Sequence, residues 1–306
     1  MKREKRQQNL RKRAEILRLI RRFFFENNYL EIETPIRIPA PIPEAYIDSF
    51  DSEGWCLHSS PEICMKQLLA SGYEKIYQLS RVFRKGERGN KHLPEFTMLE
   101  WYTKGDSYIE LMQQLEDLVR LIAIEFGEQN KIQYNKNIVD FGSAFERLSV
   151  KNAFEKYSEI SMEQALSDKK FDEIMGFEIE PLLGLTRPVF LYDYPAEKAS
   201  LARLKKDDNK YAERFELYIS GLELCNGFSE LADPVEQRMR FMKEQEIRVG
   251  GNKNIYPLPE KFLTALMSFP ESAGVAVGID RLVMLFTDSD DINDVVAFSP
   301  EELVDD

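Results

Sequence analysis

The sequence predicts an α+β protein built on an antiparallel β-sheet flanked by helices. Strand-like runs occur in adjacent pairs, in residues 75–84 with 95–102 and again within residues 214–231. Helical segments separate these pairs, but no repeated strand–helix–strand unit points to a parallel sheet. The 306 residues allow one large domain with an ample core, and their 43% apolar and 31% charged content is that of a globular protein.

Composition also narrows the class of protein. No apolar run approaches the roughly 18 residues that a membrane span requires. The basic N-terminus lacks a small-residue cleavage site after an apolar stretch, so we expect a cytoplasmic protein with no membrane partner. Three cysteines and two histidines are scattered along the chain, and Cys56 and His58 have no second pair of ligands nearby. Neither a disulfide framework nor a zinc cluster is therefore expected.

The first predicted element is a basic helix over residues 1–24. Residues 1–22 hold ten Lys or Arg and two Glu, although the whole chain has a net charge of −12. An acidic body of this kind is a poor general binder of nucleic acid, because phosphate contacts provide most of that affinity. Leu10, Ala14, Leu17 and Ile20 lie near helical spacing and should face the core. The basic face is either solvated or a docking surface for an acidic partner.

Proline, serine and glycine residues set the boundaries of the next predicted elements. Residues 29–41 read as an extended strand, because their three prolines preclude a helix. Residues 60–72 predict a short helix that Ser59 or Ser60 caps and Gly72 ends. After the strand pair 75–84 and 95–102, the remaining predicted elements are helices over 107–126, 145–157, 161–175 and 233–249, strands over 188–195 and 214–231, and a Gly-rich strand running into a helix over 272–286.

The hairpin at 214–231 carries a first candidate site. With Ser220-Gly221 as a two-residue turn, Tyr218 should face Glu223 and Glu216 should face Cys225. Glu216 and Glu223 would then be diagonal neighbours on one face, roughly 7–8 Å apart at Cα. Two such carboxylates suit Mg²⁺, which typically uses one or two carboxylates with substrate phosphates. The alternative is an exposed face that tolerates both acids.

Three further polar or aromatic side chains follow on the same strand. Asn226, Phe228 and Glu230 continue beyond the acidic pair, and we expect a bend at Asn226-Gly227 to turn them into the same cavity.

A second candidate site begins at the basic loop 84–92. The fork of Arg84 can hold a carboxylate or a phosphate through paired hydrogen bonds, and Lys85, Arg88, Lys91 and His92 add positive potential. The strand that follows places, by its period of two, one set of side chains on a single face: Phe96, Met98, Glu100 and Tyr102. A polyphosphate beside an amine fits this arrangement. The alternative is a charged hairpin tip on an amphipathic strand.

The third candidate is Arg281, at the start of an otherwise apolar helix. Gly274 and Gly278 just before it permit close backbone approach. An arginine among apolar neighbours needs a partner, which a phosphate or a stacked base would supply. A buried ion pair with Asp280 is the alternative.

These segments resemble the three signatures of class II aminoacyl-tRNA synthetases in their usual order: "YLEIETPI", "RVFRKGERGNKHLPEFTMLEWY" and "GVAVGIDRLVMLF". "SPEICMKQLL", "YDYPAEKASLAR" and "RFELYISGLELCNGFSEL" are further similar to the lysine-specific branch, and the likeness runs from about residue 10 to 300. Pro35 of the first signature lies at the dimer interface in that family, so the resemblance implies a homodimer.

The resemblance also implies an acceptor. Lysyl-tRNA synthetases carry an N-terminal OB-fold that reads the anticodon, whereas residues 1–306 look like a single catalytic domain that starts at the basic helix. This arrangement is similar to the lysyl-tRNA synthetase paralogues that attach lysine, preferentially (R)-β-lysine, to a lysine of elongation factor P. We therefore expect a ligase that uses ATP and Mg²⁺ and has no stable tRNA binding, with the basic helix as a candidate acceptor surface.

The resemblance assigns roles to the candidate residues. It implies catalysis by Arg84 and Arg281, metal binding by Glu216 and Glu223, and contacts to ATP from Arg84, Glu87, His92, Phe96, Glu216 and Arg281. The amino acid would lie against Glu62, Glu100, Tyr102, Asn226, Phe228, Glu230 and Ala276. No general base for transfer to the acceptor emerges from the sequence.

Two departures from the family pattern matter. The second signature commonly reads Phe-Arg-x-Glu, whereas Gly86 stands here where the acid is expected and Glu87 follows it. Lysine enzymes usually have Gly at the position of Ala276, and the protein-modifying paralogues have Ala. Two other functions compete with the main reading: a compact lysyl-tRNA ligase, and a non-catalytic amino-acid sensor, against which the intact charged set argues.

Overall fold

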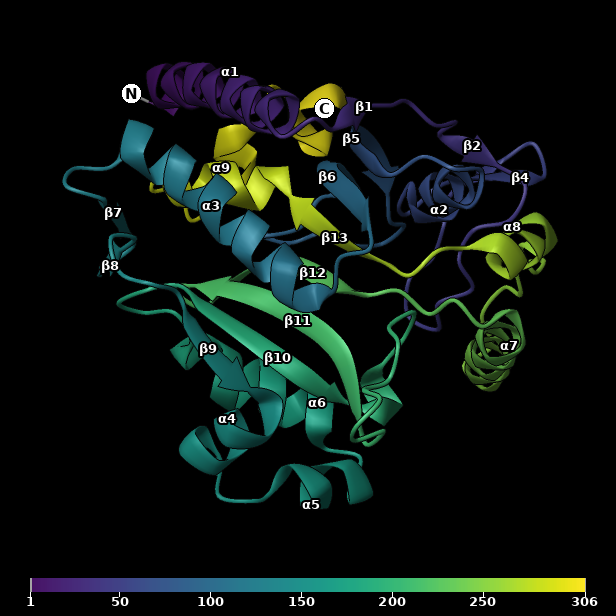
Figure 1. Ribbon diagram of the computed structural model, residues 1–306. Helices are drawn as coiled ribbons and strands as arrows, with labels where there is room; N and C mark the ends of the chain where they lie inside the picture. Colours follow the sequence, from purple (N-terminus) through teal and green to yellow (C-terminus); the bar gives the residue numbers. More distant parts are fainter. Residues whose placement is uncertain (1, 306) are drawn as a thin grey trace.

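A mixed eight-stranded sheet organises the computed structural model, which describes residues 2–305 and, within helix α1, side chains from Glu4 onward. Its strand order is β1-β5-β6-β13-β12-β11-β10-β9 (Figure 1). The strands in that order are Leu30–Glu31, Lys75–Phe83, Glu95–Lys104, Ser272–Gly278, Leu222–Ser229, Tyr211–Ile219, Val189–Pro195 and Glu146–Ser149. The α+β class expected from the sequence is confirmed.

The two edge strands depart from the expected antiparallel arrangement. All pairs from β5 to β10 are antiparallel, but β1 pairs with β5 in parallel and β9 pairs with β10 in parallel. Both edge pairs are joined by long connections, as parallel pairing requires: residues 32–74 hold short strands and one helix, and residues 150–188 are mainly helical. Strand β9 was expected to be helical; the helix begins only at Val150, where the Ser149 hydroxyl accepts a hydrogen bond from Asn152 N at 3.2 Å.

Three helices cover one face of the sheet. Helices α1 (Lys2–Glu26), α3 (Tyr108–Phe126) and α9 (Ile279–Phe286) pack there around the largest apolar core (Figure 1). Alternation along β6 sends Leu99 and Trp101 into this core and leaves Glu100 and Tyr102 on the opposite face. The core therefore fixes which side chains are available on the other side of the sheet.

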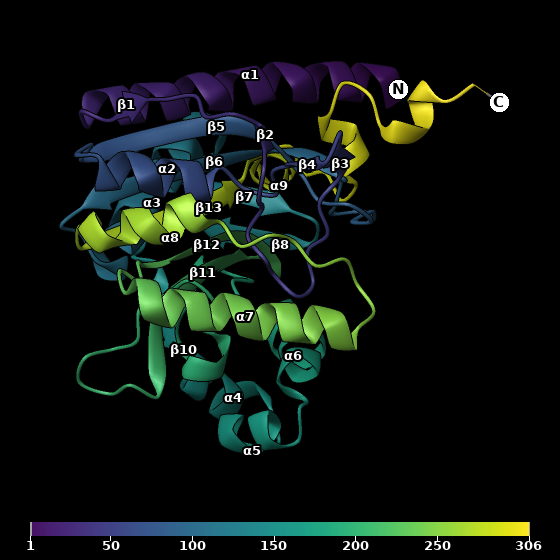
Figure 2. The same cartoon turned by 90° about the vertical axis from the view of Figure 1, so that its right-hand side faces the viewer.

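The remaining helices border the opposite face and the lower end of the sheet. Helices α2 (Glu62–Ala70), α7 (Pro234–Gly250) and α8 (Glu260–Ala265) come to the front in Figure 2. Helices α4 (Val150–Tyr157), α5 (Met162–Ser167) and α6 (Phe171–Ile174) form a separate apolar cluster against β10. The single helix expected over 161–175 is broken at Lys169, whose φ is 57°. None of the helices in residues 2–305 is long and apolar enough to cross a bilayer.

Short elements complete the fold. Two small sheets contain β2 (Arg37–Ile38), β3 (Asp51–Ser52) and β4 (Trp55–Leu57), and β7 (Lys131–Tyr134) with β8 (Asn137–Asp140). The short helical turns are Met175–Ile179, Glu180–Leu182, Ala196–Lys198, Leu266–Ser268, Ile292–Val295 and Pro300–Leu303. The strand expected over 29–41 forms only β1 and β2, because its prolines cannot donate to a sheet. Ser60, one of the two expected caps, accepts a hydrogen bond from Glu62 N at the start of α2 at 3.0 Å, and Gly72, with a φ of 107°, follows the end of the helix.

Helix α1 buries a stripe that shares Ile20 with the expected one but is otherwise shifted. Ile16, Ile20 and Phe24 are fully buried, whereas Ala14 is exposed and Leu10 and Leu17 are only partly buried. Phe24 stacks on Tyr77 at 4.4 Å between ring centroids. The four-residue spacing of the larger side chains decides which face packs, because burial of bulky apolar groups releases most free energy.

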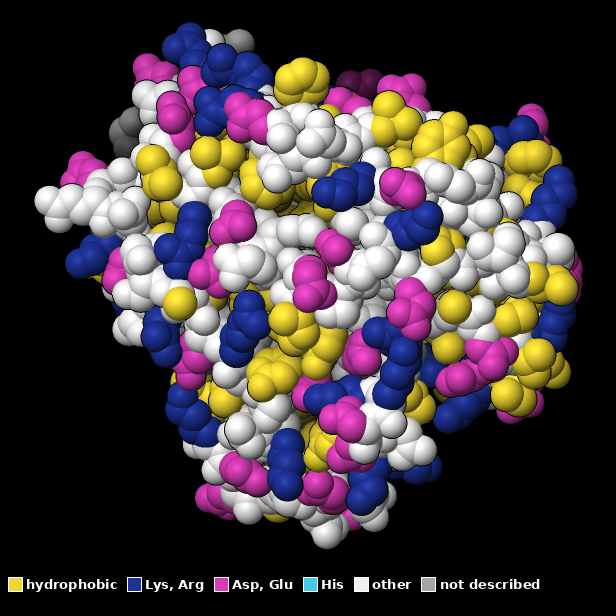
Figure 3. All heavy atoms as spheres, in the orientation of Figure 1, with side chains coloured by type: hydrophobic (Ala, Val, Ile, Leu, Met, Phe, Trp, Pro, Cys, Tyr) yellow, Lys and Arg dark blue, Asp and Glu magenta, His cyan; other side chains and the backbone are white. Residues whose placement is uncertain are grey.

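The other face of α1 is basic. In Figure 3 dark-blue side chains gather at the upper left, over the N-terminal half of this helix. Part of that charge is already paired: Arg6 lies 2.7 Å from Glu302, and Lys5 lies 3.5 Å from Asp294. Arg13 turns inward and pairs with Asp280 at 2.7 Å.

Candidate active site

A β-bulge in the β11–β12 hairpin sets the faces of the site. Tyr218 pairs with Glu223 as expected, but the next pair is Leu217 with Cys225, so Leu224 is inserted and Glu216 lies opposite Asn226. The predicted pairing of Glu216 with Cys225 is therefore wrong. Leu224 and Cys225 are each 2% exposed. The bulge lets both apolar side chains enter the core and brings Asn226 onto the face of Glu223.

The expected bend at Asn226-Gly227 does not occur, because both residues lie inside β12 and pair regularly with β11 and β13. Gly227 serves packing instead. A Cβ there would lie 2.6 Å from the Phe215 ring and 2.8 Å from Val275.

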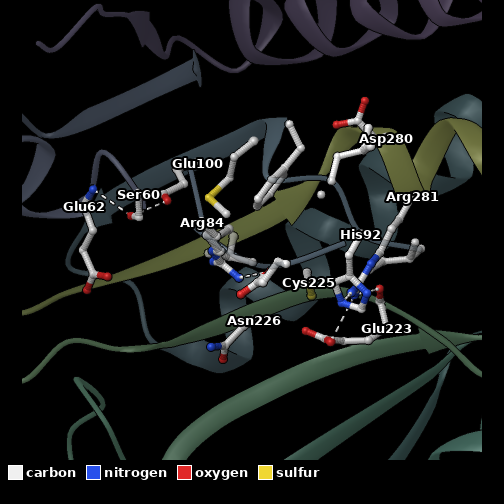
Figure 4. A pocket seen from close by; sticks show the side chains of 18 of the residues that line it. Ser60, Glu62, Arg84, His92, Glu100, Glu223, Cys225, Asn226, Asp280 and Arg281 are labelled. Atoms are coloured by element: carbon white, nitrogen blue, oxygen red, sulfur yellow. Dashed lines mark hydrogen bonds and ion pairs between the residues drawn. The ribbon is translucent and has the colours of Figure 1, made fainter. Parts of the chain in front are cut away.

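One cavity of about 490 Å³ lies on the sheet face opposite α1, α3 and α9. It gathers predicted residues from four separate stretches of the chain: Glu62 and residues within 84–102, 223–228 and 276–281 (Figure 4). Those that line it are Glu62, Arg84, Glu87, His92, Phe96, Glu100, Tyr102, Glu223, Asn226, Phe228, Ala276 and Arg281. Glu216 and Glu230 do not line it: Glu216 lies opposite Asn226 in the β11–β12 pair, and Glu230 lies close to Gly274, which lines the cavity.

One end of the cavity is acidic. Glu100 accepts hydrogen bonds from Ser60 Oγ at 2.6 Å and from Tyr102 OH at 3.0 Å. Burial, followed by the charge of Glu62, raises the pKa of Glu100 to about 8. Burial likewise raises the pKa of Glu230 to about 8, with Glu62 and Glu100 adding to the increase. A cation placed beside a buried carboxyl group with a raised pKa strongly favours its ionised form.

Lys66 is the buried cation of this end, and sequence reasoning missed it. Its side chain is 1% exposed, lies 2.5 Å from Glu62 Oε1 and forms an ion pair with Glu230. These two carboxylates keep the pKa of Lys66 above its usual value despite burial. The spacing of four residues from Glu62 on a helix was the available signal. Three carboxylates around one lysine leave an excess of negative charge that suits an ammonium group.

Gly274 allows this acidic end to form. A Cβ at this position would lie 2.2 Å from Tyr102 Cε1 and 2.7 Å from Glu230 Oε1. Only glycine leaves room for both side chains.

The opposite end of the cavity is cationic (Figure 4). Arg281 donates to Glu223 Oε2 at 3.1 Å and to His92 Nε2 at 2.6 Å. Burial, and then Arg281, lower the pKa of His92, so the ring is neutral and can accept this bond. Asp280 pairs with Arg13 and accepts from Thr97 N at 2.7 Å, so the alternative ion pair of Arg281 with Asp280 is not found. Arg281 is held beside the cavity by groups that incoming phosphates could replace.

Arg84 lies between the two ends. Its guanidinium is 5.3 Å from the centroid of the Phe96 ring and 3.9 Å from Glu87, the acid displaced by Gly86. Arg84 Nε is buried without a hydrogen-bond partner among the described residues. Since a buried donor of this kind favours an acceptor, Arg84 is suited to an anionic ligand.

Glu216 and Glu223 provide hard oxygen donors beside the cationic end. Glu216 accepts hydrogen bonds from Tyr194, Tyr218 and Arg214, each at 2.6 Å. Burial raises the pKa of Glu216, and the charge of Glu223 adds to this effect. No group of three or more His, Cys, Asp or Glu side chains in the described residues forms a complete protein metal site. The two carboxylates nevertheless fit Mg²⁺, because that ion takes the rest of its ligands from phosphates and water.

The open face of the sheet carries an acidic end and two arginines, Arg84 and Arg281, in one cavity. This is the arrangement that the resemblance to class II synthetases implies for a catalytic core. The chain belongs to this family: residues 1–302 match the model of class II tRNA synthetases for D, K and N. The family expected from the three signatures is confirmed.

Curated relatives cover nearly the whole chain. Elongation factor P--(R)-beta-lysine ligase of Pectobacterium carotovorum subsp. carotovorum is 38% identical over 96% of this chain and 95% of its own length. The protein of the same name from Photorhabdus laumondii subsp. laumondii is 39% identical over 95% and 94%. Lysine--tRNA ligase of Prochlorococcus marinus is 37% identical over 94% of this chain and 61% of its own length.

Proposed function

We propose that this protein is an ATP-dependent ligase that activates lysine or (R)-β-lysine as an aminoacyl-adenylate and transfers it to a lysine side chain of elongation factor P. The observation that supports the proposal is a cavity with an acidic end, which suits an amine, and a cationic end, which suits phosphates. Relatives that bear this activity in their name align with nearly the whole chain and are covered over nearly their whole length.

In the first step, the chain's own residues bind and orient the reactants. Glu100, Tyr102 and Glu230 take the distal ammonium and Glu62 the reactive amino group, which leaves the substrate carboxylate near Arg84 and Asn226. Arg84 and Arg281 stabilise the charge that develops as the carboxylate oxygen attacks the α-phosphate and pyrophosphate leaves. Glu216 and Glu223 would hold Mg²⁺, whose charge would offset that of the phosphates. Positioning and charge stabilisation suffice, without a covalent nucleophile.

The proposal also covers the cellular location, the oligomeric state and the acceptor surface. The protein is a cytoplasmic homodimer with no stable tRNA binding, and residues 1–306 act as one catalytic domain. The basic face of α1, where Arg11 and Lys12 are exposed, is a docking surface for a part of the acceptor remote from its modified lysine, because α1 lies on the other face of the sheet from the cavity.

Intact-mass measurement of elongation factor P, beside acid-precipitable charging of total tRNA, tests the acceptor. Each reaction contains the protein, ATP, Mg²⁺ and either lysine or (R)-β-lysine. We expect a mass gain on elongation factor P with little tRNA charging, and the better isomer identifies the substrate. Charged tRNA with unmodified protein would favour the lysyl-tRNA ligase alternative. Absence of pyrophosphate exchange with either isomer would favour a sensor.

Glu223→Gln is expected to abolish adenylate formation, because the neutral amide weakens metal binding and the contact with Arg281. Pyrophosphate exchange should fall by roughly 10²–10³-fold, the effect of losing one preorganised electrostatic contact in a transition state. The exposed Glu159 provides a matched control, since Glu159→Gln makes the same change far from the cavity. Near-normal exchange in Glu223→Gln, across a titration of Mg²⁺, would remove Glu223 from the metal site.

Ala276→Gly is expected to shift substrate preference towards α-lysine. Ala276 lines the cavity on β13, between Glu100 and Asn226 on the neighbouring strands. One methyl group at this point changes the space available to the amino-acid backbone, an effect typically of about 1–3 kcal/mol in discrimination. The ratio of kcat/KM values for the two isomers in pyrophosphate exchange measures it, and an unchanged ratio would dispose of this role.

A further inference from the structure

Glu44 stands between the substrate cavity and a second cavity of about 210 Å³. Among the residues that the structure describes, only Ile42 and Glu44 line both. The second cavity lies between helix α7 and residues 196–204. In Figure 2 the purple chain that follows β2 descends towards α7. The two cavities therefore meet at one carboxylate.

The backbone of Glu44 is firmly held. Arg248, which is 0% exposed, donates to Glu44 O at 2.8 Å and also binds Ile47 O and Asp48. Ala45 N donates to Glu244 Oε2 at 2.8 Å. By contrast, the Glu44 carboxylate makes no hydrogen bond or ion pair with any residue in the described part of the chain. The structure thus fixes the backbone from which this side chain extends and leaves its oxygens available.

The groups that face Glu44 keep its affinity for a proton high. Arg84 and Glu87 reach it from the loop after β5, Glu62 from α2, and Glu244 from α7. Burial is the main effect and the three acids add to it, while Arg84 opposes them; together they raise the pKa of Glu44 to about 7. A carboxylate with such a pKa can accept a proton at neutral pH and release it again.

The second cavity contains a polar group without a protein partner. Gln237, on α7, is 1% exposed, and neither Nε2 nor Oε1 of its side chain has a hydrogen-bond partner among the described residues. Since leaving a buried carboxamide unpaired is costly, this cavity favours a polar ligand. An acceptor ammonium on a long side chain has the required chemistry, because Gln237 Oε1 can accept its hydrogen bond.

We propose that the acceptor lysine enters through the second cavity, past Gln237, and that Glu44 is the base that deprotonates it. This inference rests on the proposed function. The ammonium gives one proton to Glu44, and the free amine forms a C–N bond with the carbonyl carbon of the aminoacyl-adenylate. The bond between the carbonyl carbon and the phosphate oxygen of AMP then breaks. AMP leaves with that oxygen on its phosphate, and the nitrogen loses a second proton. Both protons finally reach solvent, so the products are the amide and AMP.

The test separates the two half-reactions in the full-length protein. Pyrophosphate exchange reports adenylate formation, and single-turnover transfer to elongation factor P reports the second step. In Glu44→Gln we expect unchanged exchange and transfer slowed by roughly 10²–10⁴-fold at neutral pH, the usual effect of a general base. The deficit should shrink as pH rises, because free amine becomes abundant. Glu159→Gln should behave as wild type in both assays.

Reaction of the adenylate with hydroxylamine distinguishes a base from a residue that only supports the structure. It is already uncharged at neutral pH, so it needs no base, and Glu44→Gln should form hydroxamate from the adenylate at the wild-type rate. Equal losses with hydroxylamine and with a lysine acceptor, or a deficit that does not depend on pH, would overturn the role of Glu44. Gln237→Met should raise the KM for the acceptor without changing exchange; an unchanged KM would overturn the entry route.

Failure of the proposed acceptor can be told apart from failure of this inference. If wild-type protein does not modify elongation factor P, Nα-acetyl-lysine amide at high concentration presents the same ammonium to the adenylate. The comparison of Glu44→Gln with wild type is then made on this small acceptor and on hydroxylamine, with the same expected difference.

Discussion

Gly274→Ala is expected to reduce amino-acid activation by at least about 10²-fold, the loss that a displacement of about 1 Å in an active site can cause. The added Cβ would lie 2.2 Å from Tyr102 Cε1 and 2.7 Å from Glu230 Oε1, closer than two such atoms can approach. The backbone cannot move away easily, because β13 is paired on both sides by β6 and β12. Tyr102 or Glu230 must therefore leave its place at the acidic end.

Pyrophosphate exchange as a function of amino-acid concentration measures this effect. Gly176→Ala is the matched control, because a Cβ at Gly176 meets no atom within 4 Å. Overpacking also destabilises folded proteins by typically about 1–3 kcal/mol, so thermal unfolding of both variants should accompany the assay. A Gly274→Ala protein with wild-type exchange would mean that neither side chain binds the substrate.

Lys66→Met is expected to destabilise the protein by about 3–5 kcal/mol near pH 8, the usual result of removing one partner from a buried ion pair. Lys66 is the cation between Glu62 and Glu230, and methionine of similar length leaves both acids without it. The loss is large against the roughly 5–15 kcal/mol that keeps a typical domain folded.

The effect should depend on pH. The pKa of Glu230 is raised from 4.5 to about 8 in the folded protein, so this group favours the folded state when protonated and loses that preference as pH rises from about 5 to 8. This value already includes the charge of Lys66, which lowers it, so the pKa of Glu230 should rise further in Lys66→Met. The difference in unfolding free energy between wild type and Lys66→Met should therefore grow as pH rises above about 8, where Glu230 ionises in wild type and stays protonated in the variant.

Urea unfolding at several pH values measures this difference. The control is Lys151→Met on the exposed side of α4, which should change the free energy of unfolding by less than about 0.5 kcal/mol at every pH. A constant difference between Lys66→Met and wild type would show that Lys66 contributes by packing and not by charge.

Local alternation was enough to place part of the site. Phe96, Glu100 and Tyr102 lie on one face of β6 because the strand is regular and its other face is apolar. The same reasoning failed at β12, where Leu224 and Cys225 are consecutive apolar residues and the position of the extra residue depends on the core across the sheet. A sequence pattern cannot distinguish a bulge from a regular register when both bury one apolar side chain.

Other features depend on contacts between distant segments. Gly274 is required by Tyr102 and Glu230, and Glu44 acquires its surroundings from α2, α7 and the loop at Arg84. Arg281 and Asp280 are neighbours in the chain, yet Asp280 pairs with Arg13 of α1. These partners are separated by long stretches of sequence, so no local sequence pattern predicts their contacts.

The packing of α1 has a consequence for synthesis on the ribosome. The helix rests on α9 and on the turn Ile292–Val295, and Asn9 binds Ser289 and the backbone of Asp294. Translation proceeds at roughly 5–20 residues per second, so α1 waits on the order of ten seconds or more for these partners to appear. During that interval Phe24 can already stack on Tyr77, but the rest of the Ile16, Ile20 and Phe24 stripe lacks part of the core that covers it in the finished protein. The nascent chain is therefore expected to need a chaperone or a transient shelter before the sheet can close.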